Sequence, residues 1–198
     1  MLFRSGVVQV IEGNRFSLGE LDGSTTPRIQ AISEAMTRAG FKAPVVRDVR
    51  SEIWLKLWGN LSFNPISALT HSTLAGLLRF PLTRELSIEM MREAEAVANK
   101  LGVTFRVGID KRIAGAEKVG EHKTSMLQDV EAGRPLELEA LIGAVVELGR
   151  LTQTPTPHID AVYALVSLLA KQLGETHGRL SLPSSPNFPD QSKSVQMA

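Results

Sequence analysis

Residues 51–69 place three polar side chains at intervals of four in an otherwise strongly apolar segment, and this spacing constrains the fold more than any other feature. On an α-helix, positions four apart lie on one face, because each residue turns the chain by about 100°. Lys56, Asn60 and Asn64 therefore form one stripe on a predicted helix. Such groups are costly to bury unless hydrogen bonds satisfy them, and a ligand is one source of those bonds. The spacing also suits a lysine that reaches solvent and asparagines that bond to neighbouring helices.

Residues 51–173 carry apolar side chains at helical intervals, which predicts an all-helical unit and a mainly α fold class. Ser51 is expected to cap the first of these helices, and Pro65 to kink it, because proline lacks a backbone donor. The predicted helices are residues 51–69, 74–78, 81–101, 107–119, 125–130, 137–148 and 157–173.

The residues before this unit have a different pattern, in which strands alternate with one helix. Thr26 and Pro27 begin the helix and Gly40 ends it. The predicted strands are residues 7–11, 15–18 and 44–49, with a tight turn at residues 12–14. Alternation of this kind is typical of the closing part of an α/β domain.

The sequence thus predicts three parts. Residues 1–49 are the α/β remnant, residues 50–175 are the helical unit, and residues 176–198 are a tail. The tail is rich in proline and serine and has neither a helical nor a strand period, so it is expected to be disordered.

Composition limits the partners. The 198 residues carry a formal net charge of +1 and no long basic run, which gives no electrostatic reason to expect nucleic acid or an anionic membrane. The absence of cysteine excludes disulfides and thiolate ligands, and the short, interrupted apolar start is unlike a signal peptide, so a cytoplasmic location is expected. His158 and Asp160 follow Pro157 and are read as a helix entry, not a metal site, because no second ligand pair lies nearby.

A second polar cluster comprises Ser125, Gln128, Asp129 and Glu137. Ser125 can serve as a helix N-cap and Glu137 as an acidic residue in a first helical turn. No histidine lies close to Ser125 in sequence, and nothing around it matches a nucleophile elbow. Local rules alone therefore favour a capping role over a catalytic one.

Two motifs in a fixed order give a resemblance to a known family. The run WLKLWGNLSFNPISAL at residues 54–69, followed by TSMLQD at residues 124–129 and then Glu137, closely resembles the C-terminal domain of ketopantoate reductase. That family, also called 2-dehydropantoate 2-reductase, reduces a 2-keto acid with NADPH on the way to pantothenate. The resemblance implies an all-helical domain of the 6-phosphogluconate dehydrogenase C-terminal type, preceded by a remnant of a Rossmann domain.

The resemblance also implies roles for five residues. Lys56 matches the family's catalytic lysine, which hydrogen-bonds the keto oxygen and acts as general acid. Asn60 and Asn64 match asparagines that hold hydroxyl and carboxylate groups of the substrate. Ser125 matches a serine that binds the substrate, and Glu137 matches an acid near the nicotinamide ribose and the lysine. A homodimer is a further expectation.

One part of the family pattern is missing from this sequence. Its glycines make no G-x-G-x-x-G, the turn that holds a dinucleotide pyrophosphate at a helix N-terminus. Residues 1–49 resemble only the closing strands and helix of a truncated dinucleotide-binding domain, so the chain is expected to be inactive alone. Two alternatives remain open: a non-catalytic helical module that dimerises or binds a protein, and a reductase of a different 2-keto acid.

Overall fold

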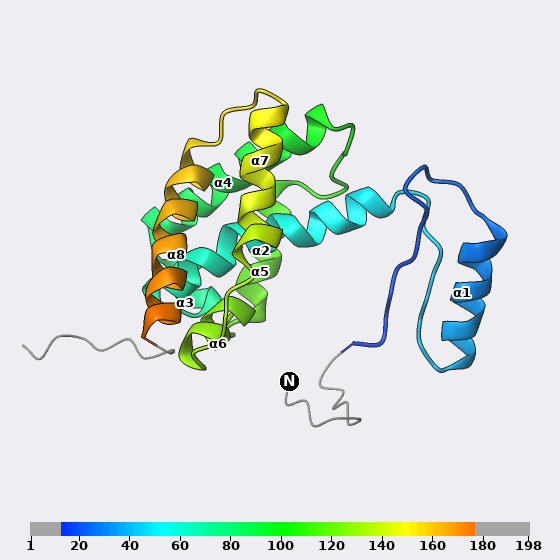
Figure 1. Cartoon of the computed structure of the whole chain (residues 1–198), viewed down its shortest axis with the longest axis horizontal. Helices are drawn as coiled ribbons and strands as arrows, with labels where there is room; N and C mark the ends of the chain where they lie inside the picture. The colour runs from blue at the N-terminus through cyan, green and yellow to red at the C-terminus, as the bar shows by residue number, and fades with distance from the viewer. Residues whose placement is uncertain (1–12, 177–198) are drawn as a thin grey trace, which may run out of the picture.

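The computed structural model describes residues 13–176, and this part of the chain is mainly α-helical (Figure 1). All seven helical segments predicted after residue 50 are confirmed, with ends that differ by a few residues. The predicted strand at residues 7–11 and residues 177–198 of the predicted tail lie outside the described residues. The helical elements are α1 Pro27–Arg38, α2 Val49–Thr70, α3 Leu74–Arg79, α4 Pro81–Lys100, α5 Ile109–Val119, α6 Ser125–Glu131, the π-helical turn η1 Glu139–Gly143, α7 Ala144–Leu151 and α8 Pro157–Glu175.

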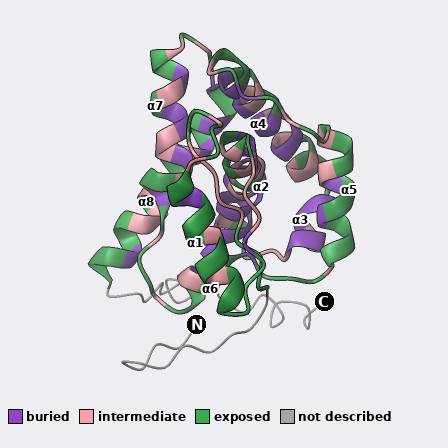
Figure 2. Ribbon diagram, turned by 90° about the vertical axis from the view of Figure 1, so that its right-hand side faces the viewer, coloured by how far each residue is buried: buried purple, intermediate pink, exposed green. Residues whose placement is uncertain are grey.

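Helix α2 is the centre of the bundle. It packs against α3, α4, α6, α8 and η1, and its buried face is visible in purple in Figure 2. Trp58 is completely buried, stacks on Phe105 with ring centroids 4.2 Å apart, and donates from Nε1 to the Met91 carbonyl at 2.7 Å. The segment that carries the polar stripe is therefore also the core of the fold.

The cap of α2 differs from the prediction. Asp48, not Ser51, is the N-cap: its carboxylate accepts from the Ser51 backbone N–H at 3.0 Å and from the Ser51 hydroxyl at 2.5 Å. Pro65 lies inside α2, yet the helix continues through it to Thr70. Packing on several sides offsets the one backbone hydrogen bond that proline cannot make.

We expect Asp48→Ala to lower the free energy of unfolding by about 0.5–2 kcal/mol at neutral pH, the usual range for a lost cap. Hydrogen bonds from the Ser51 hydroxyl and then from its backbone N–H lower the pKa of Asp48. The contribution is therefore complete above the unfolded-state pKa of about 3.9 and is lost as pH falls through the lower folded-state pKa. Urea denaturation between neutral pH and pH ~3 measures this convergence of wild type and variant. Asp48→Asn, which keeps the cap but cannot ionise, is the control, and a constant gap between wild type and Asp48→Ala would contradict the assignment.

The N-terminal unit consists of α1 and two extended segments that pair in parallel. Residues 14–18 and 42–46 are joined by four backbone hydrogen bonds of 2.7–3.0 Å, among them Phe16 N–H to Lys42 O and Val46 N–H to Leu18 O. The pairing forms isolated bridges rather than the full strands predicted at residues 15–18 and 44–49, because each segment has one partner in the described chain. A parallel pair with a helical crossover remains characteristic of α/β domains.

Helix α1 begins and ends as predicted. Thr26 caps it by accepting from Ile29 N–H at 3.2 Å, Pro27 is its first residue, and Gly40 takes a φ of +91° just after its end. Of its apolar residues, Ile29 is buried, whereas Ile32 is 42% exposed. Part of the apolar face of α1 therefore lies uncovered in the described structure.

Candidate functional site

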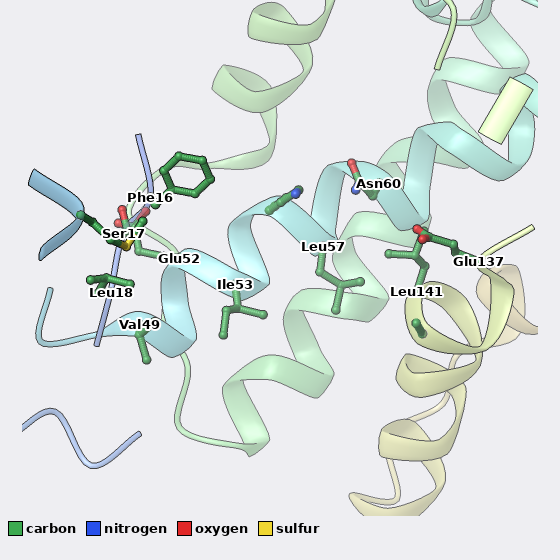
Figure 3. Close-up of a pocket in the computed structure, with 13 residues that line it drawn as sticks. Phe16, Ser17, Leu18, Val49, Glu52, Ile53, Leu57, Asn60, Glu137 and Leu141 are labelled. Atoms are coloured by element: carbon green, nitrogen blue, oxygen red, sulfur yellow. The ribbon is translucent and has the colours of Figure 1, made fainter. Parts of the chain in front are cut away.

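Two adjoining cavities lie along α2. The first, of about 770 Å³, is bounded by residues 16–18 of the N-terminal unit, by the start of α2 and by the approach to η1 (Figure 3). The second, of about 460 Å³, lies between α2, α5 and the start of α6. Lys56, Asn60 and Glu137 line both. These three side chains mark the junction at which molecules in the two cavities would meet.

The polar stripe runs from solvent into the protein. Lys56 is exposed, Asn60 is half-buried, and Asn64 is only 6% exposed. The exposure of Lys56 agrees with the alternative in which the lysine reaches solvent. The first turns of α2 extend beyond the bundle toward the N-terminal unit (Figure 1).

Asn64 and Ser125 meet at the inner end of the second cavity. Asn64 Nδ2 donates to Ser125 Oγ at 3.3 Å, which joins two segments far apart in sequence. One of the alternatives for the asparagines, a bond to a neighbouring helix, is therefore confirmed for Asn64. The partner is another of the predicted site residues.

The predicted capping role of Ser125 is wrong. Thr124 is the N-cap of α6: its hydroxyl accepts from Leu127 N–H at 3.3 Å and donates to Ser67 Oγ on α2 at 3.0 Å. Both Thr124 and Ser67 are buried, so this bond holds the start of α6 against α2. Because Thr124 makes the cap, the hydroxyl of the exposed Ser125 is not needed for it and can line the second cavity.

Glu137 lies just before the helix that it was predicted to begin. It is exposed, and η1 starts two residues later. Within η1, Glu139 accepts from Tyr163 OH at 2.7 Å, and this bond raises the pKa of Tyr163. Gly143 makes room for the pair, since a Cβ there would lie 2.5 Å from Glu139 Oε2. This contact ties η1 to α8 and so supports the segment that carries Glu137.

The remaining members of the second cluster are engaged elsewhere. Gln128 donates to the Lys123 carbonyl at 2.9 Å, and Asp129 pairs with Arg134 at 2.7 Å. Neither residue lines the two cavities. The structure therefore separates Ser125 and Glu137 from Gln128 and Asp129.

Sequence reasoning missed Arg112 and His122, which also line the second cavity. Arg112 lies on α5 together with Ala116 and Val119, at intervals that bring all three to one face. Gly59, in the middle of an apolar helix, was a possible signal, because glycine weakens a helix unless something must approach its backbone.

The reading of His158 as a helix entry is confirmed. His158 lies in the first turn of α8, and the backbone N–H groups of His158 and Ile159 donate to the Glu93 carboxylate at 2.9 and 3.0 Å. His158 Nδ1 also lies 2.6 Å from Glu93 Oε1. Residues 13–176 contain no group of three or more histidine or acidic side chains placed to hold a metal ion.

No helix within residues 13–176 is long and apolar enough to cross a bilayer.

Comparisons with known proteins agree on one family. The family model for the C-terminal domain of ketopantoate reductase (PanE/ApbA) matches residues 48–170. A 2-dehydropantoate 2-reductase from Mesorhizobium japonicum is 59% identical over 169 residues, which are 85% of this chain and 52% of that protein. One from Archaeoglobus fulgidus is 32% identical over 143 residues, 72% of this chain and 48% of that protein.

Solved structures give the same result. The crystal structure of 2-dehydropantoate 2-reductase from Methylococcus capsulatus superposes with a TM-score of 0.76 at 32% identity, covering 82% of this chain and 57% of that one. The chain spans about half the length of the curated relatives it matches. The match over residues 48–170 covers α2 to α7 and most of α8, and with them every residue of the predicted site. The chain belongs to the ketopantoate reductase family.

Proposed function

We propose that this chain supplies the substrate-binding and catalytic half of an NADPH-dependent 2-dehydropantoate 2-reductase. The observation that carries the proposal is the junction of the two cavities, where Lys56, Asn60 and Glu137 line both. A reductase must bring a carbonyl carbon and a hydride donor into contact, and two adjoining cavities that share polar residues suit this task. Residues 50–175 would form the catalytic unit and residues 1–49 the end of a dinucleotide-binding domain.

In this proposal the substrate occupies the second cavity with its keto group toward the junction. Lys56 donates a hydrogen bond to the keto oxygen and then gives it a proton, so that the carbonyl becomes a hydroxyl. Asn60 and the bonded pair of Asn64 and Ser125 hold the rest of the molecule. The exposure of Lys56 lets the neutral amine that remains take up a proton from solvent.

The first cavity fits the reacting end of a nicotinamide cofactor better than a whole dinucleotide. It is open, mostly apolar at Phe16, Leu18 and Leu57, and carries Glu137 and Asn60 at its inner side (Figure 3). Glu137 could accept from the ribose hydroxyls. The cofactor supplies the hydride, and the sequence offers no glycine-rich turn for its pyrophosphate.

NADPH oxidation in the presence of 2-dehydropantoate tests the proposal. We expect little or no turnover from this chain alone and clear turnover from a chimera that joins it to the N-terminal half of the Mesorhizobium japonicum relative. A chimera that folds and binds NADPH but leaves 2-dehydropantoate unreduced would contradict the proposal. Pyruvate and other 2-keto acids run beside it would reveal a different substrate.

The alternative of a non-catalytic module rests on exposed apolar groups in the N-terminal unit. Phe16 and Phe41 form an edge-to-face pair with centroids 5.3 Å apart, yet they are 47% and 40% exposed. Leu21 is 70% exposed. Such a patch favours association with another copy or another protein. A stable dimer by light scattering, with no keto acid binding, would favour the module; a homodimer that also turns over substrate is compatible with the enzyme.

A further inference from the structure

Arg112 occupies a position in the second cavity that packing alone does not explain. Its guanidinium lies directly against the backbone of α2 at Gly59. A Cβ at Gly59 would lie 2.1 Å from Nη2, 2.9 Å from Cζ and 3.0 Å from Nε of Arg112. Any larger residue at Gly59 would displace the guanidinium, so α2 keeps a helix-weakening glycine at the point where the arginine lies.

Within residues 13–176, no side-chain hydrogen bond of the Arg112 guanidinium is present. Its Nε is buried and has no hydrogen-bond partner in the described structure, and burial lowers the pKa of Arg112 below its ordinary value. Buried donors in folded proteins are nearly always paired. Helix α5 has two acidic residues: Asp110 lies in its first turn, and Glu117 is bonded to Arg84 at 3.4 Å. Among residues 13–176, none of the ion pairs involves Arg112.

The cavity that Arg112 lines has the charge balance of a site for a small monoanion. Lys56 and Arg112 contribute two positive charges and Glu137 one negative charge. Lys56 and Glu137 lie at the junction with the first cavity. Arg112 lines the second cavity but not the first. A planar guanidinium with free N–H groups matches a carboxylate in two parallel hydrogen bonds.

We propose that Arg112 binds the carboxylate of the ligand in this cavity and selects 2-keto acids over uncharged carbonyl compounds. The choice of a keto acid rests on the proposed function; the carboxylate preference rests on Arg112 and Gly59. With the carboxylate held at Arg112, the neighbouring keto group would extend toward Lys56. Arg112 would then both add affinity and set the direction in which the substrate lies.

Isothermal titration of the full chain with 2-dehydropantoate, with its methyl ester and with pyruvate tests the proposal. We expect wild type to bind the acid at least 10-fold more tightly than the ester, since hydrogen bonds to charged groups commonly contribute factors of about 10 to 100. Arg112→Gln should remove this preference. It should lower the affinity for the acid by about 10- to 100-fold and the affinity for the ester by less than about 3-fold. Arg112→Lys should retain part of the preference for the acid, because lysine keeps the positive charge but not the planar guanidinium that donates two parallel hydrogen bonds.

Gly59→Ala is an independent variant, because it leaves Arg112 in the sequence but places a Cβ where its guanidinium lies. It should reduce the acid preference as Arg112→Gln does. Arg84→Gln is the matched control: it removes an equal charge next to α5, at a residue that does not line the cavity, and should leave binding unchanged. Circular dichroism establishes that each variant is folded.

Equal affinity of wild type for the acid and its ester would overturn the proposal, whether or not the variants fold. An equal loss of affinity for the acid and the ester in Arg112→Gln would also overturn the proposal, because an equal loss would show that Arg112 has a structural role. If pyruvate binds in an Arg112-dependent manner while the chimera reduces no 2-dehydropantoate, the proposed function fails and the carboxylate site stands. If the chimera reduces 2-dehydropantoate with the same KM after Arg112→Gln, the proposed function stands and the carboxylate site fails.

Discussion

Lys56→Ala is expected to lower the turnover of 2-dehydropantoate in the chimera by about 10²- to 10⁴-fold, the usual contribution of a general acid. KM should change much less, because Asn60, Asn64 and Ser125 still hold the substrate. Since Lys56 is exposed, its removal should alter the free energy of unfolding by no more than about 0.5 kcal/mol. Steady-state NADPH oxidation and urea denaturation measure the two quantities.

Two controls accompany this experiment. Lys100→Ala removes an exposed lysine at the end of α4, away from both cavities, and should leave turnover unchanged. Lys56→Arg keeps the charge but is a poor proton donor at neutral pH, because an arginine side chain stays protonated. Turnover of Lys56→Ala within about 3-fold of wild type would rule out a role as general acid.

Trp58→Ala is expected to lower the free energy of unfolding by about 3–5 kcal/mol, the range for deleting a large buried aromatic residue. Trp58 is fully buried at the centre of α2, so its removal leaves a cavity where α2 meets α4, and the stack on Phe105 is lost. Urea denaturation followed by circular dichroism at 222 nm measures the loss.

Trp58→Phe separates packing from hydrogen bonding. It keeps a ring on Phe105 but removes the indole donor to the Met91 carbonyl, which lies within α4, and the lost bond should cost about 0.5–1.5 kcal/mol. Leu165→Ala, at a residue of α8 that is 59% exposed, should change stability by less than about 0.5 kcal/mol. A loss below about 1 kcal/mol for Trp58→Ala would contradict the central role of this residue.

The helices could be predicted because their signals are local. The periodicity of residues 51–173, Pro27 and Pro157 at helix starts, and Gly40 and Gly102 after helix ends each act within one or two turns. The two wrong predictions of helix caps also concern local signals. Asp48 replaces Ser51, and Thr124 replaces Ser125, because nearby residues of similar capping ability compete and only packing selects between them.

The predicted strands show a different limit. Extended segments become strands only when partners continue the hydrogen-bonded ladder, and residues 14–18 and 42–46 have only each other in the described chain. Sequence alone indicates a tendency to extend. It says nothing about how many neighbouring segments are present.

The candidate site likewise has a part that local sequence determines and a part that only tertiary packing determines. The chain's own order of residues determines the Lys56, Asn60 and Asn64 stripe, because a helix converts a spacing of four into a shared face. Tertiary packing alone decides that Lys56 is exposed while Asn64 is buried, that Asn64 meets Ser125, and that the guanidinium of Arg112 lies on Gly59. These contacts join segments far apart in the chain, and no local propensity encodes which distant side chain a buried polar group will face.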